Sequence, residues 1–431
     1  MAHALTLIKD TLHGIRTVGL MSAFRAALYP FRRSYYEAKF GSGDDRGSVL
    51  RGLAGLITAV RPAGKAQLDP HGLVSLGNVL SYTQEGQAIA LRCQDGWLQI
   101  TVLAPDLLRV RLSESKALLP QQSYAIAKPD HEWRNTPYAL KETTVAIDII
   151  TERVTCRIAK RPCRLGFLDS NGQDIHADTT GLGWQDSRVA HFSQLHHHEH
   201  IYGLGEQSFP LDRRGHSYTM WNSDPQSYEP GDQPLYLNIP FYIGLHDGQG
   251  YGVLYENTFY SRLDAGETSP GEIIYVAEGG ELCYYFFYGP ALTTILERYT
   301  ELTGRMRLPP LWALGYQQSR WSYYPASRVR EIARLFREHR IPCDVLHLDI
   351  HYMHGYRCFT WDNERFPDPS ALLSDLHDQG FKIVVIIDCG IKADPHYQIC
   401  AKGLAHDMFC TYPDGTVASG PVWPGVCYFP D

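Results

Sequence analysis

The sequence has no surplus of basic charge. Its 40 Lys and Arg residues are outnumbered by 47 Asp and Glu, which gives a formal net charge of −7. Proteins that bind a nucleic-acid backbone usually carry a basic surface, so we expect no nucleic-acid partner. The chain also contains no P-loop and no GxSxG motif, so neither phosphate-loop nor nucleophile-elbow chemistry is indicated.

Long apolar runs are missing as well. The stretch Val49–Val60 is apolar but short and contains Arg51, whereas a helix that spans a bilayer needs about 20 apolar residues. Residues Met1–Asp10 do not show a basic segment followed by an apolar one, which is the pattern of a secretory signal. These absences predict a protein without a transmembrane segment.

The ten cysteines form no CxxC pair. They are scattered at positions 93, 156, 163, 283, 343, 358, 389, 400, 410 and 427. In a long chain such scatter is typical of reduced, mostly buried thiols rather than of a disulfide framework. We therefore expect a cytoplasmic protein, and we expect no metal or other cofactor.

What the sequence does contain is ordinary globular material. Of its 431 residues, 44% are apolar and 20% are charged, enough to bury a large core in about two or three domains. Aromatic residues make up 12%. That share is compatible with sugar-binding surfaces, although for any single ring a place in a β-rich core is the simpler interpretation.

Residues 1–65 form a basic leader. Its basic side chains are interleaved with apolar and aromatic ones; they include Lys9, Arg16, Arg25, Arg32, Arg33 and Lys39. A basic amphipathic helix can lie on an anionic membrane surface. A helical extension packed on its own domain explains the pattern more simply, and this is the structure we expect.

Residues 66–305 predict an antiparallel β-sandwich. Apolar residues alternate with polar or small ones over short runs, for example at Leu98, Ile100 and Val102. A period of two marks strands with one buried face. Many such runs, separated by turn signals, favour a sandwich of the antiparallel type.

A linking helix is expected at the end of this segment. Its apolar face is predicted at Leu292, Ile295, Leu296 and Tyr299, which have helical spacing. Gly304 stands where a C-terminal cap belongs. The pair Pro309-Pro310 then marks a boundary, and the pattern changes again.

From residue 306 onward, strands and helices alternate. The predicted strands are Leu311–Gln317, Val345–Leu348 and Ile383–Ile387, the last of them buried on both faces. The predicted helices begin at Ser327 and at Asp368-Pro369, and Gly380 closes the second. We expect residues 306–431 to be the first part of a (β/α)8 barrel, with strands 1–3 and part of the next unit, since a complete barrel takes about 250 residues.

Two carboxylates end neighbouring strands of this segment. Asp349 follows the second predicted strand and Asp388 the third, and the carboxyl ends of barrel strands carry the active site. Either aspartate alone could simply cap the next turn. The pair, with Trp361 and Trp423 in following loops, favours a sugar site, because carboxylates accept paired hydroxyl hydrogen bonds and aromatic rings form walls.

The run His196-His197-His198-Glu199-His200 invites a metal-site interpretation. Adjacent residues of a strand point to opposite faces, so the run cannot easily supply three ligands to one ion. A solvated turn or edge is the favoured interpretation. Gly203-Leu204-Gly205 lacks the further glycine that a dinucleotide loop needs, so we expect no nucleotide site there.

From Tyr202 onward, several motifs occur in a recognisable order. They are YGLGEQ at 202–207, MWNSD at 220–224, PFYIGL at 240–245, RWSYY at 320–324, LDIHYMHGYRCFTWD at 348–362, RFPDP at 365–369, IIDCGIK at 386–392 and VWPGVCYFPD at 422–431. In this order they resemble glycoside hydrolase family 31, a family of retaining α-glucosidases. The resemblance implies a galactose-mutarotase-like sandwich ahead of the barrel.

The resemblance also implies roles for particular residues. The candidate substrate-binding residues are Asp349, Ile350, Asp388, Trp321, Trp423 and Asp224. Asp349 matches the aspartate that binds hydroxyls of the non-reducing glucose, and Ile350 resembles the glucosidase rather than the α-xylosidase form of the motif. Trp321, Asp388 and Trp423 match pocket positions, and Asp224 matches a sandwich loop that reaches over the barrel mouth. The chain departs from the pattern at His351, where many members carry a second Asp.

The two catalytic carboxylates of a retaining glycosidase are missing. Such an enzyme needs a nucleophile and an acid/base about 5–5.5 Å apart. In the family that the chain resembles, the nucleophile is the Asp of a W-x-D-M-N-E-like motif after barrel strand 4, and no such motif occurs here. We therefore expect the nucleophile and the acid/base Asp beyond residue 431, and we expect the chain alone, as the front portion of a longer enzyme, to be inactive.

The sequence thus predicts a retaining α-glucosidase that acts on the terminal non-reducing glucose of α-glucosides or maltooligosaccharides. A non-catalytic carbohydrate-binding module is the second interpretation, and α-xylosidase or sulfosugar specificity within the same family stays open. A mutarotase-like epimerase is a third. It requires a His and a carboxylate that face one sugar-sized groove.

Overall fold

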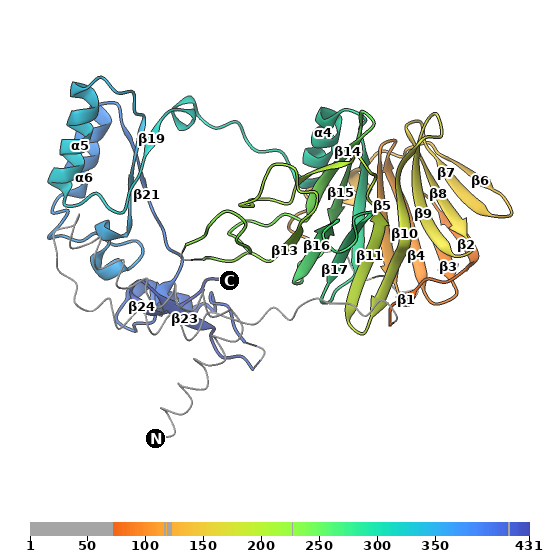
Figure 1. Cartoon of the computed structure of the whole chain (residues 1–431). Helices are drawn as coiled ribbons and strands as arrows, with labels where there is room; N and C mark the ends of the chain where they lie inside the picture. The colour runs from red at the N-terminus through yellow and green to blue at the C-terminus, as the bar shows by residue number, and fades with distance from the viewer. Residues whose placement is uncertain (1–71, 116–117, 119–122, 226, 413) are drawn as a thin grey trace. The chain divides into compact units, whose positions relative to one another are not determined.

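The computed structural model describes residues 72–431 apart from 116–117, 119–122, 226 and 413 (Figure 1). The predicted basic leader, residues 1–65, lies outside the described residues. The chain divides into two compact units, one ending at Met306 and the other running Arg307–Asp431. The first consists almost wholly of strands, and the second alternates short strands with helices.

Two antiparallel sheets make up the first unit (Figure 1). One has the strand order β13-β16-β17-β11-β10-β9-β8-β7-β6, with β1 paired to β10. Its strands are β1 (Val74–Ser75), β6 (Ala139–Glu142), β7 (Ala146–Ile150), β8 (Val154–Lys160), β9 (Cys163–Asp169), β10 (Asp174–Gln185), β11 (Arg188–Gln194), β13 (Ser217–Met220), β16 (Ser261–Ala265) and β17 (Glu272–Ala277).

The second sheet has the order β12-β14-β15-β18-β5-β4-β3-β2. Its strands are β2 (Val79–Glu85), β3 (Ala88–Cys93), β4 (Trp97–Ala104), β5 (Leu107–Ser113), β12 (His200–Gly203), β14 (Phe241–His246), β15 (Gln249–Tyr255) and β18 (Leu282–Tyr288). Most neighbours in both sheets are consecutive in the chain, as in β-hairpins. A short 3₁₀ turn, η1 (Asp130–Glu132), lies between β5 and β6.

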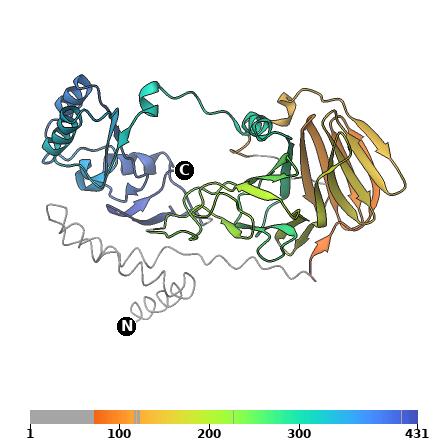
Figure 2. The ribbon, with the colours of Figure 1, turned by 45° about the horizontal axis from the view of Figure 1, so that its top comes forward.

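The core of this unit lies between the two sheets, which stack face to face in both views (Figures 1 and 2). Phe167 of β9 and Phe286 of β18 come from different sheets, and their rings stack with centroids 3.7 Å apart. Ile100 of β4 and Ile158 of β8 are fully buried in the same cluster. Burial of one such side chain contributes about 1.5–3 kcal/mol. The predicted antiparallel sandwich is confirmed.

The helix α4 (Leu292–Thr303) covers the face of the second sheet that is turned away from this core. Ile295 and Leu302 are its buried residues, and Tyr299 stacks on Phe241 of β14 at 4.1 Å between ring centroids. The predicted cap is confirmed, because Gly304 follows the helix with a φ of 95°, a conformation that glycine adopts without strain.

The predicted apolar face of α4 is wrong in part. Leu292 and Leu296 are 37% and 47% exposed, whereas Leu302 belongs to the buried side. The helix contacts β15 and β18, and these strands meet the side of the helix that carries Ile295 and Leu302. Helical spacing alone does not decide which side of α4 faces the sheet, because the helix has apolar residues on either side of its predicted apolar face.

Within its described residues the second unit contains two small sheets and three α-helices (Figure 1). Its elements are η2 (Leu311–Leu314), β19 (Gln317–Gln318), α5 (Ala326–Glu338), β20 (Val345–Leu348), η3 (Ile350–Tyr352), η4 (His354–Tyr356), α6 (Pro369–Asp378), β21 (Lys382–Val385), β22 (Ile391–Lys392), α7 (Gln398–Ala405), β23 (Ser419–Val422) and β24 (Gly425–Tyr428). β19, β20 and β21 pair in parallel, in chain order. Each strand-to-strand connection carries a helix, which confirms the first units of a βα barrel.

Three local predictions in this unit are confirmed. The strand Val345–Leu348 is β20. Asp368 caps α6, since its side chain accepts a hydrogen bond from the Ala371 N–H at 2.9 Å. Gly380 follows that helix with a φ of 81°. Pro at the start and Gly after the end match the intrinsic preferences of the two residues.

Two other local predictions in this unit are wrong. Instead of one strand, Leu311–Gln317 contains the 3₁₀ turn η2, and only Gln317 joins the short strand β19. Pro310 immediately precedes this turn, and its fixed φ is compatible with a helical start. Ser327 does not cap α5, because the helix already begins at Ala326, whose N–H donates to the Arg365 carbonyl.

The strand Ile383–Ile387 is shorter and less buried than predicted. β21 ends at Val385, and Ile386 and Ile387 are 40% and 52% exposed. Within the described residues, β21 is the outer strand of its sheet, with β20 as its neighbour. A run of β-branched residues is buried on both faces only where strands and helices cover it, and here one side alone packs against the unit's core.

Candidate functional site

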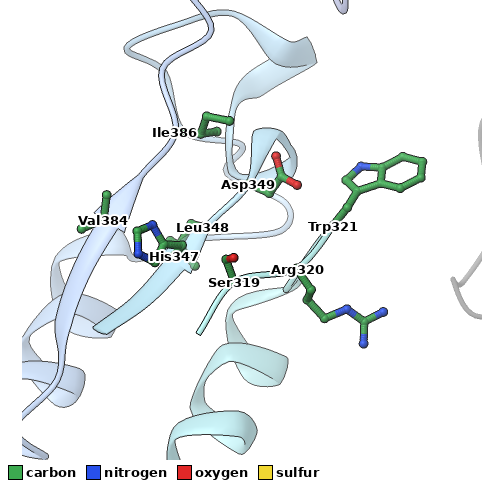
Figure 3. A pocket seen from close by; sticks show the side chains of 8 residues that line it. All are labelled: Ser319, Arg320, Trp321, His347, Leu348, Asp349, Val384 and Ile386. Atoms are coloured by element: carbon green, nitrogen blue, oxygen red, sulfur yellow. The ribbon is translucent and has the colours of Figure 1, made fainter. Parts of the chain in front are cut away.

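A pocket of about 530 Å³ lies at the carboxyl ends of β19, β20 and β21 (Figure 3). Its lining residues are Ser319, Arg320, Trp321, His347, Leu348, Asp349, Val384 and Ile386. Three of them follow β19, three lie at the end of β20, and two belong to β21 or directly follow it. In parallel βα folds ligands bind at this edge of the sheet.

The parallel register determines which side chains face the pocket. Leu346 of β20 packs in the unit's core together with its partner Ile383 of β21. His347 pairs with Val384 one residue further on, and these two side chains point to the opposite face, because successive residues of a strand alternate. The His347 Nε2 lies 2.9 Å from the Gln317 Oε1 of β19, which links β20 to β19 at this face.

Asp349 provides the carboxylate of the pocket (Figure 3). It directly follows β20 and its Oδ1 accepts a hydrogen bond from the Ile350 N–H at 2.8 Å, at the start of η3. Burial raises the pKa of the Asp349 carboxyl, and the hydrogen bond from Ile350 opposes that rise. The carboxylate therefore caps the following turn and also faces the pocket, so the capping and the binding interpretation are compatible.

Trp321 forms an exposed aromatic wall of the same pocket (Figure 3). Its side chain is 38% exposed, although a ring of this size is usually more fully buried. The indole centroid lies 6.0 Å from the ring of His351. An exposed ring beside a half-buried carboxylate presents a flat apolar face and a hydrogen-bond acceptor to one small ligand.

Asp388 lies at the same end of the sheet as Asp349. The Ile386 N–H still donates to the Leu348 carbonyl at 3.0 Å, so the parallel pairing continues past β21. The Asp388 backbone carbonyl accepts a hydrogen bond from the Cys358 thiol. Burial and then the nearby Asp388 charge raise the pKa of Cys358. Asp388 is thus next to the loop after β20, but it is not one of the pocket-lining residues.

Ile350 and Trp423 do not line the pocket. Ile350 is 2% exposed and lies in the hydrophobic core of the unit. Trp423 stands between β23 and β24 and packs against the same core. Their predicted contact with substrate stays a prediction.

Asp224 belongs to the other unit. It is exposed and lies in the loop that follows β13. The neighbouring Ser223 N–H donates to the Leu235 carbonyl at 2.9 Å, which joins two parts of the connection between β13 and β14. A role of Asp224 over the barrel mouth also stays a prediction.

Sequence reasoning missed Ser319, Arg320 and His347 as pocket residues. The rule that singled out Asp349, a polar residue at a strand end, would also have found Ser319 and Arg320 had β19 been placed correctly. His347 could have been found from the alternation along β20, since it is the polar residue between Leu346 and Leu348.

The histidine tract of the sandwich forms a turn. His197 and His198 are exposed, whereas Glu199 is fully buried. Its carboxylate accepts hydrogen bonds from the Tyr251 hydroxyl and from the His196 N–H, and burial raises its pKa. Among the described residues no group of His, Cys, Asp and Glu side chains is placed to hold a metal ion.

The histidines buried in the sandwich do not face a groove. His176 and His191 are 1% and 0% exposed. His191 lies 2.9 Å from Asp178 through Nε2 and 2.9 Å from the Tyr255 hydroxyl through Nδ1. The mutarotase interpretation needs a histidine and a carboxylate that a sugar can reach, and these groups are enclosed by the core.

None of the helices in the described part of the chain is long and apolar enough to cross a membrane.

The structure has a β-sandwich followed by parallel βα units, with a pocket at the carboxyl ends of their strands. These features define a protein of the βα-barrel class with a preceding sandwich domain. Comparison with known families agrees with this architecture. Residues 306–431 match the TIM-barrel domain of glycosyl hydrolases family 31, and residues 98–264 match the N-terminal galactose mutarotase-like domain of the same family. The chain belongs to glycoside hydrolase family 31.

Similar proteins include two microbial glucosidases. The chain is 37% identical over 376 residues to Alpha-glucosidase 2 of Bacillus thermoamyloliquefaciens, a match that covers 86% of this chain and 47% of that protein. It is 37% identical over 247 residues to an alpha-glucosidase of Saccharolobus solfataricus, with 57% of this chain and 35% of that protein covered. The chain thus spans less than half the length of each of these two relatives.

A solved structure of the same family shares the fold. The GH31 dextranase of Flavobacterium johnsoniae, in complex with glucose, superposes with a TM-score of 0.77 at 29% identity, over 83% of this chain and 44% of that one. The glucosidase II alpha subunit superposes with a TM-score of 0.72 at 21% identity, over 83% of this chain and 48% of that one. The second comparison supports the fold alone.

Proposed function

We propose that the chain is the substrate-binding front portion of a retaining α-glucosidase, which binds the terminal non-reducing glucose of α-glucosides or maltooligosaccharides. The observation that carries the proposal is the shared pocket of Asp349 and Trp321 at the carboxyl ends of three parallel strands. A volume of about 530 Å³ lies within the usual range for small-molecule sites.

The chemistry of the pocket suits a hexose. An ionised carboxylate accepts hydrogen bonds at two oxygens and can therefore bind two adjacent hydroxyl groups. The exposed indole of Trp321 offers an apolar face to the C–H groups of a sugar ring. The names of the relatives agree with this ligand class, since the similar curated proteins are alpha-glucosidases and the dextranase structure contains glucose.

The proposal excludes hydrolysis by this chain. Retaining cleavage needs two carboxyl groups about 5–5.5 Å apart, and among the described pocket-lining residues Asp349 is the only carboxylic acid. We propose that the 431 residues bind sugar without turning it over. The second candidate function, a non-catalytic carbohydrate-binding module, rests on the same observation.

Calorimetry and a hydrolysis assay test the proposal together. Glucose and maltose should bind saturably to the full chain, and Asp349→Ala should abolish binding. Asp394→Ala, which removes a carboxylate from the same unit outside the pocket, serves as the control and should bind normally. Turnover of a chromogenic α-glucoside above background, lost in Asp349→Ala, would overturn the proposed lack of activity.

A sugar panel separates the specificities within the family. Xylose lacks the exocyclic carbon of glucose, and a 6-sulfonated glucose carries a negative charge. Arg320 lines the pocket, and a guanidinium group suits an anionic sulfonate, which is the observation that favours the sulfosugar alternative. Tighter binding of the sulfonated sugar than of glucose, lost in Arg320→Met, would support that alternative.

We also propose a cytoplasmic location. All ten cysteines are free thiols, which supports a reducing compartment. Fractionation of the source cells, followed by detection of the chain with an antibody, tests this. Recovery of the chain in the extracellular fraction would contradict it.

A further inference from the structure

Cys93 and Cys163 meet across the β-sandwich. Cys93 is the last residue of β3 and Cys163 is the first residue of β9, and these strands belong to different sheets. Both side chains are 2% exposed and lie in the core between the sheets. The Cys163 N–H donates to the Gly77 carbonyl at 2.7 Å, and the N–H of Gln94, the residue after Cys93, donates to the Asn78 carbonyl at 2.9 Å. Both cysteines therefore flank the same short segment, and each thiol shifts the pKa of the other. Packing of the two sheets, rather than sequence proximity, brings the sulfurs together.

The pair lies at an end of the sandwich, directly beneath two turns. The residues that follow Cys93 or precede Cys163 are exposed: Gln94, Asp95, Arg161 and Pro162. Local opening at strand ends needs far less free energy than global unfolding. A small oxidant can therefore reach the two sulfurs while the rest of the sandwich stays folded.

The two sulfurs differ in acidity. The neighbouring Cys163 thiol lowers the pKa of Cys93 despite its burial, and the neighbouring Cys93 thiol together with burial holds the pKa of Cys163 well above the ordinary value. Burial, and then the charges of Asp178 and Asp148, raise the pKa of Cys156 on the neighbouring strand β8. Because the thiolate is the nucleophile, we expect Cys93 to react first and Cys163 to attack the oxidised sulfur.

We propose that Cys93 and Cys163 form a redox site that closes to an inter-sheet disulfide with hydrogen peroxide as the oxidant. In the first step the Cys93 thiolate attacks the peroxide, the O–O bond breaks, and a sulfenic acid and hydroxide form. In the second step the Cys163 sulfur attacks the sulfenic sulfur, the S–S bond forms, and the hydroxyl group leaves as water with the Cys163 proton. The hydroxide takes up the proton that Cys93 released on ionisation. In total two thiols lose two electrons, and one peroxide becomes two waters.

The disulfide would join β3 to β9 and so tie the two sheets to each other. A cross-link between positions far apart in the chain removes conformational freedom from the unfolded state. We expect the midpoint of thermal unfolding of the sandwich to rise by about 5–15 °C on oxidation. A dithiol reductant should reverse the change.

Peptide mapping of the folded full chain tests the proposal. After peroxide treatment and alkylation of the remaining thiols, the peptides that contain Cys93 and Cys163 should be found joined, with the loss of two hydrogens, and reduction should separate them. Cys163→Ser should leave a Cys93 sulfenic acid that dimedone traps. Cys156→Ala, a change at a buried cysteine outside the pair, should still form the bridge.

The peptide map of the chain without substitutions tests the proposal even if a variant fails to fold. Alkylation of Cys93 and Cys163 as free thiols, under conditions that oxidise the exposed Cys389, would overturn the proposal. So would a bridge from Cys93 to a different cysteine. An unchanged unfolding midpoint after quantitative bridge formation would contradict the stabilising role.

Discussion

The ring of His351 stacks on the ring of Tyr324, with centroids 4.5 Å apart and planes within 4° of parallel. Tyr356 meets the same imidazole edge-on at 5.5 Å, and the Arg365 guanidinium lies over Tyr324 at 4.8 Å. His351 is 7% exposed. The residue at which the chain departs from the family pattern is therefore part of an aromatic stack beside Asp349, rather than an open rim position.

Removal of this stacked ring should destabilise the second unit. We expect His351→Ala to lower the free energy of unfolding by about 2–3 kcal/mol, because it removes a nearly buried ring and leaves a cavity between two tyrosines. His351→Phe keeps a flat ring and should lose less than half as much. Urea denaturation of both variants measures the difference. Equal stability of the alanine and phenylalanine variants would show that ring stacking is unimportant here.

Asp349→Asn should separate stability from binding. Because burial raises the pKa of Asp349, its charged form is disfavoured in the folded state, so the carboxylate destabilises the fold at pH values above its folded pKa. The asparagine variant should unfold at a higher temperature than the parent chain at pH 7. The difference should vanish as the pH falls to about 3.9, the ordinary pKa of Asp.

The same variant should bind glucose poorly, since an amide accepts hydrogen bonds at only one of its two terminal atoms, whereas a carboxylate accepts at both. Thermal unfolding at several pH values and calorimetry with glucose provide the two readouts. A stability gain with normal glucose binding would exclude Asp349 as the sugar-binding carboxylate. A loss of stability at pH 7 would contradict the burial argument.

Trp321→Ala should weaken sugar binding with little effect on the fold. The side chain is 38% exposed, so its removal costs the core little, whereas a stacked sugar would lose its aromatic wall. We expect roughly tenfold weaker binding of maltose, equivalent to about 1.4 kcal/mol. Trp321→Phe, which retains an aromatic face, should recover part of the affinity. Titration calorimetry gives both values, and unaltered affinity in the alanine variant would place the sugar elsewhere.

His176 should make the sandwich sensitive to acid. Both of its ring nitrogens are buried without a hydrogen-bond partner among the described residues. Burial, and then the nearby His191, His196 and His246, hold its pKa well below the ordinary value. The unfolded chain takes up a proton near pH 6.5 and the folded chain does not. Stability contributed by the neutral imidazole is therefore present above pH 6.5 and lost as the pH falls.

His176→Phe tests that dependence with a ring of similar shape. The free energy of unfolding of the parent chain should fall by up to about 1.4 kcal/mol per pH unit below 6.5 through this group, and the phenylalanine variant should show a shallower fall. Denaturation with urea between pH 7.5 and 5 supplies the comparison. Parallel pH profiles for the two proteins would disprove this role of His176.

The class of fold could be predicted from the sequence because it depends on local patterns. The period-two runs around Ile100 and Ile158 required strands with one buried face, and the two sheets confirm this. Asp368 and Gly380 each carry their own boundary signal, so the limits of α6 followed from single residues. The positions of Asp349 and Asp388 at one edge also followed, since parallel strands align their carboxyl ends.

Where predictions failed, a neighbour distant in the chain was responsible. The strands that α4 covers decide which side of this helix is buried. Ile386 and Ile387 are exposed because β21 has no second neighbouring strand within the described residues. Likewise Glu199 lies in a tract of histidines that is expected to be solvated, yet its buried carboxylate accepts a hydrogen bond from Tyr251, on a strand far along the chain.

The sequence by itself determined the family, the order of sandwich and βα units, and the strand-end aspartates, because these follow from residue types and spacings along one segment. The tertiary structure alone decided that Trp321 shares a pocket with Asp349 while Ile350 does not line it, that His351 is stacked rather than open, and that Cys93 and Cys163 lie in one core. Those relations depend on side-chain direction and sheet packing, and both arise only when segments far apart in the chain are brought together.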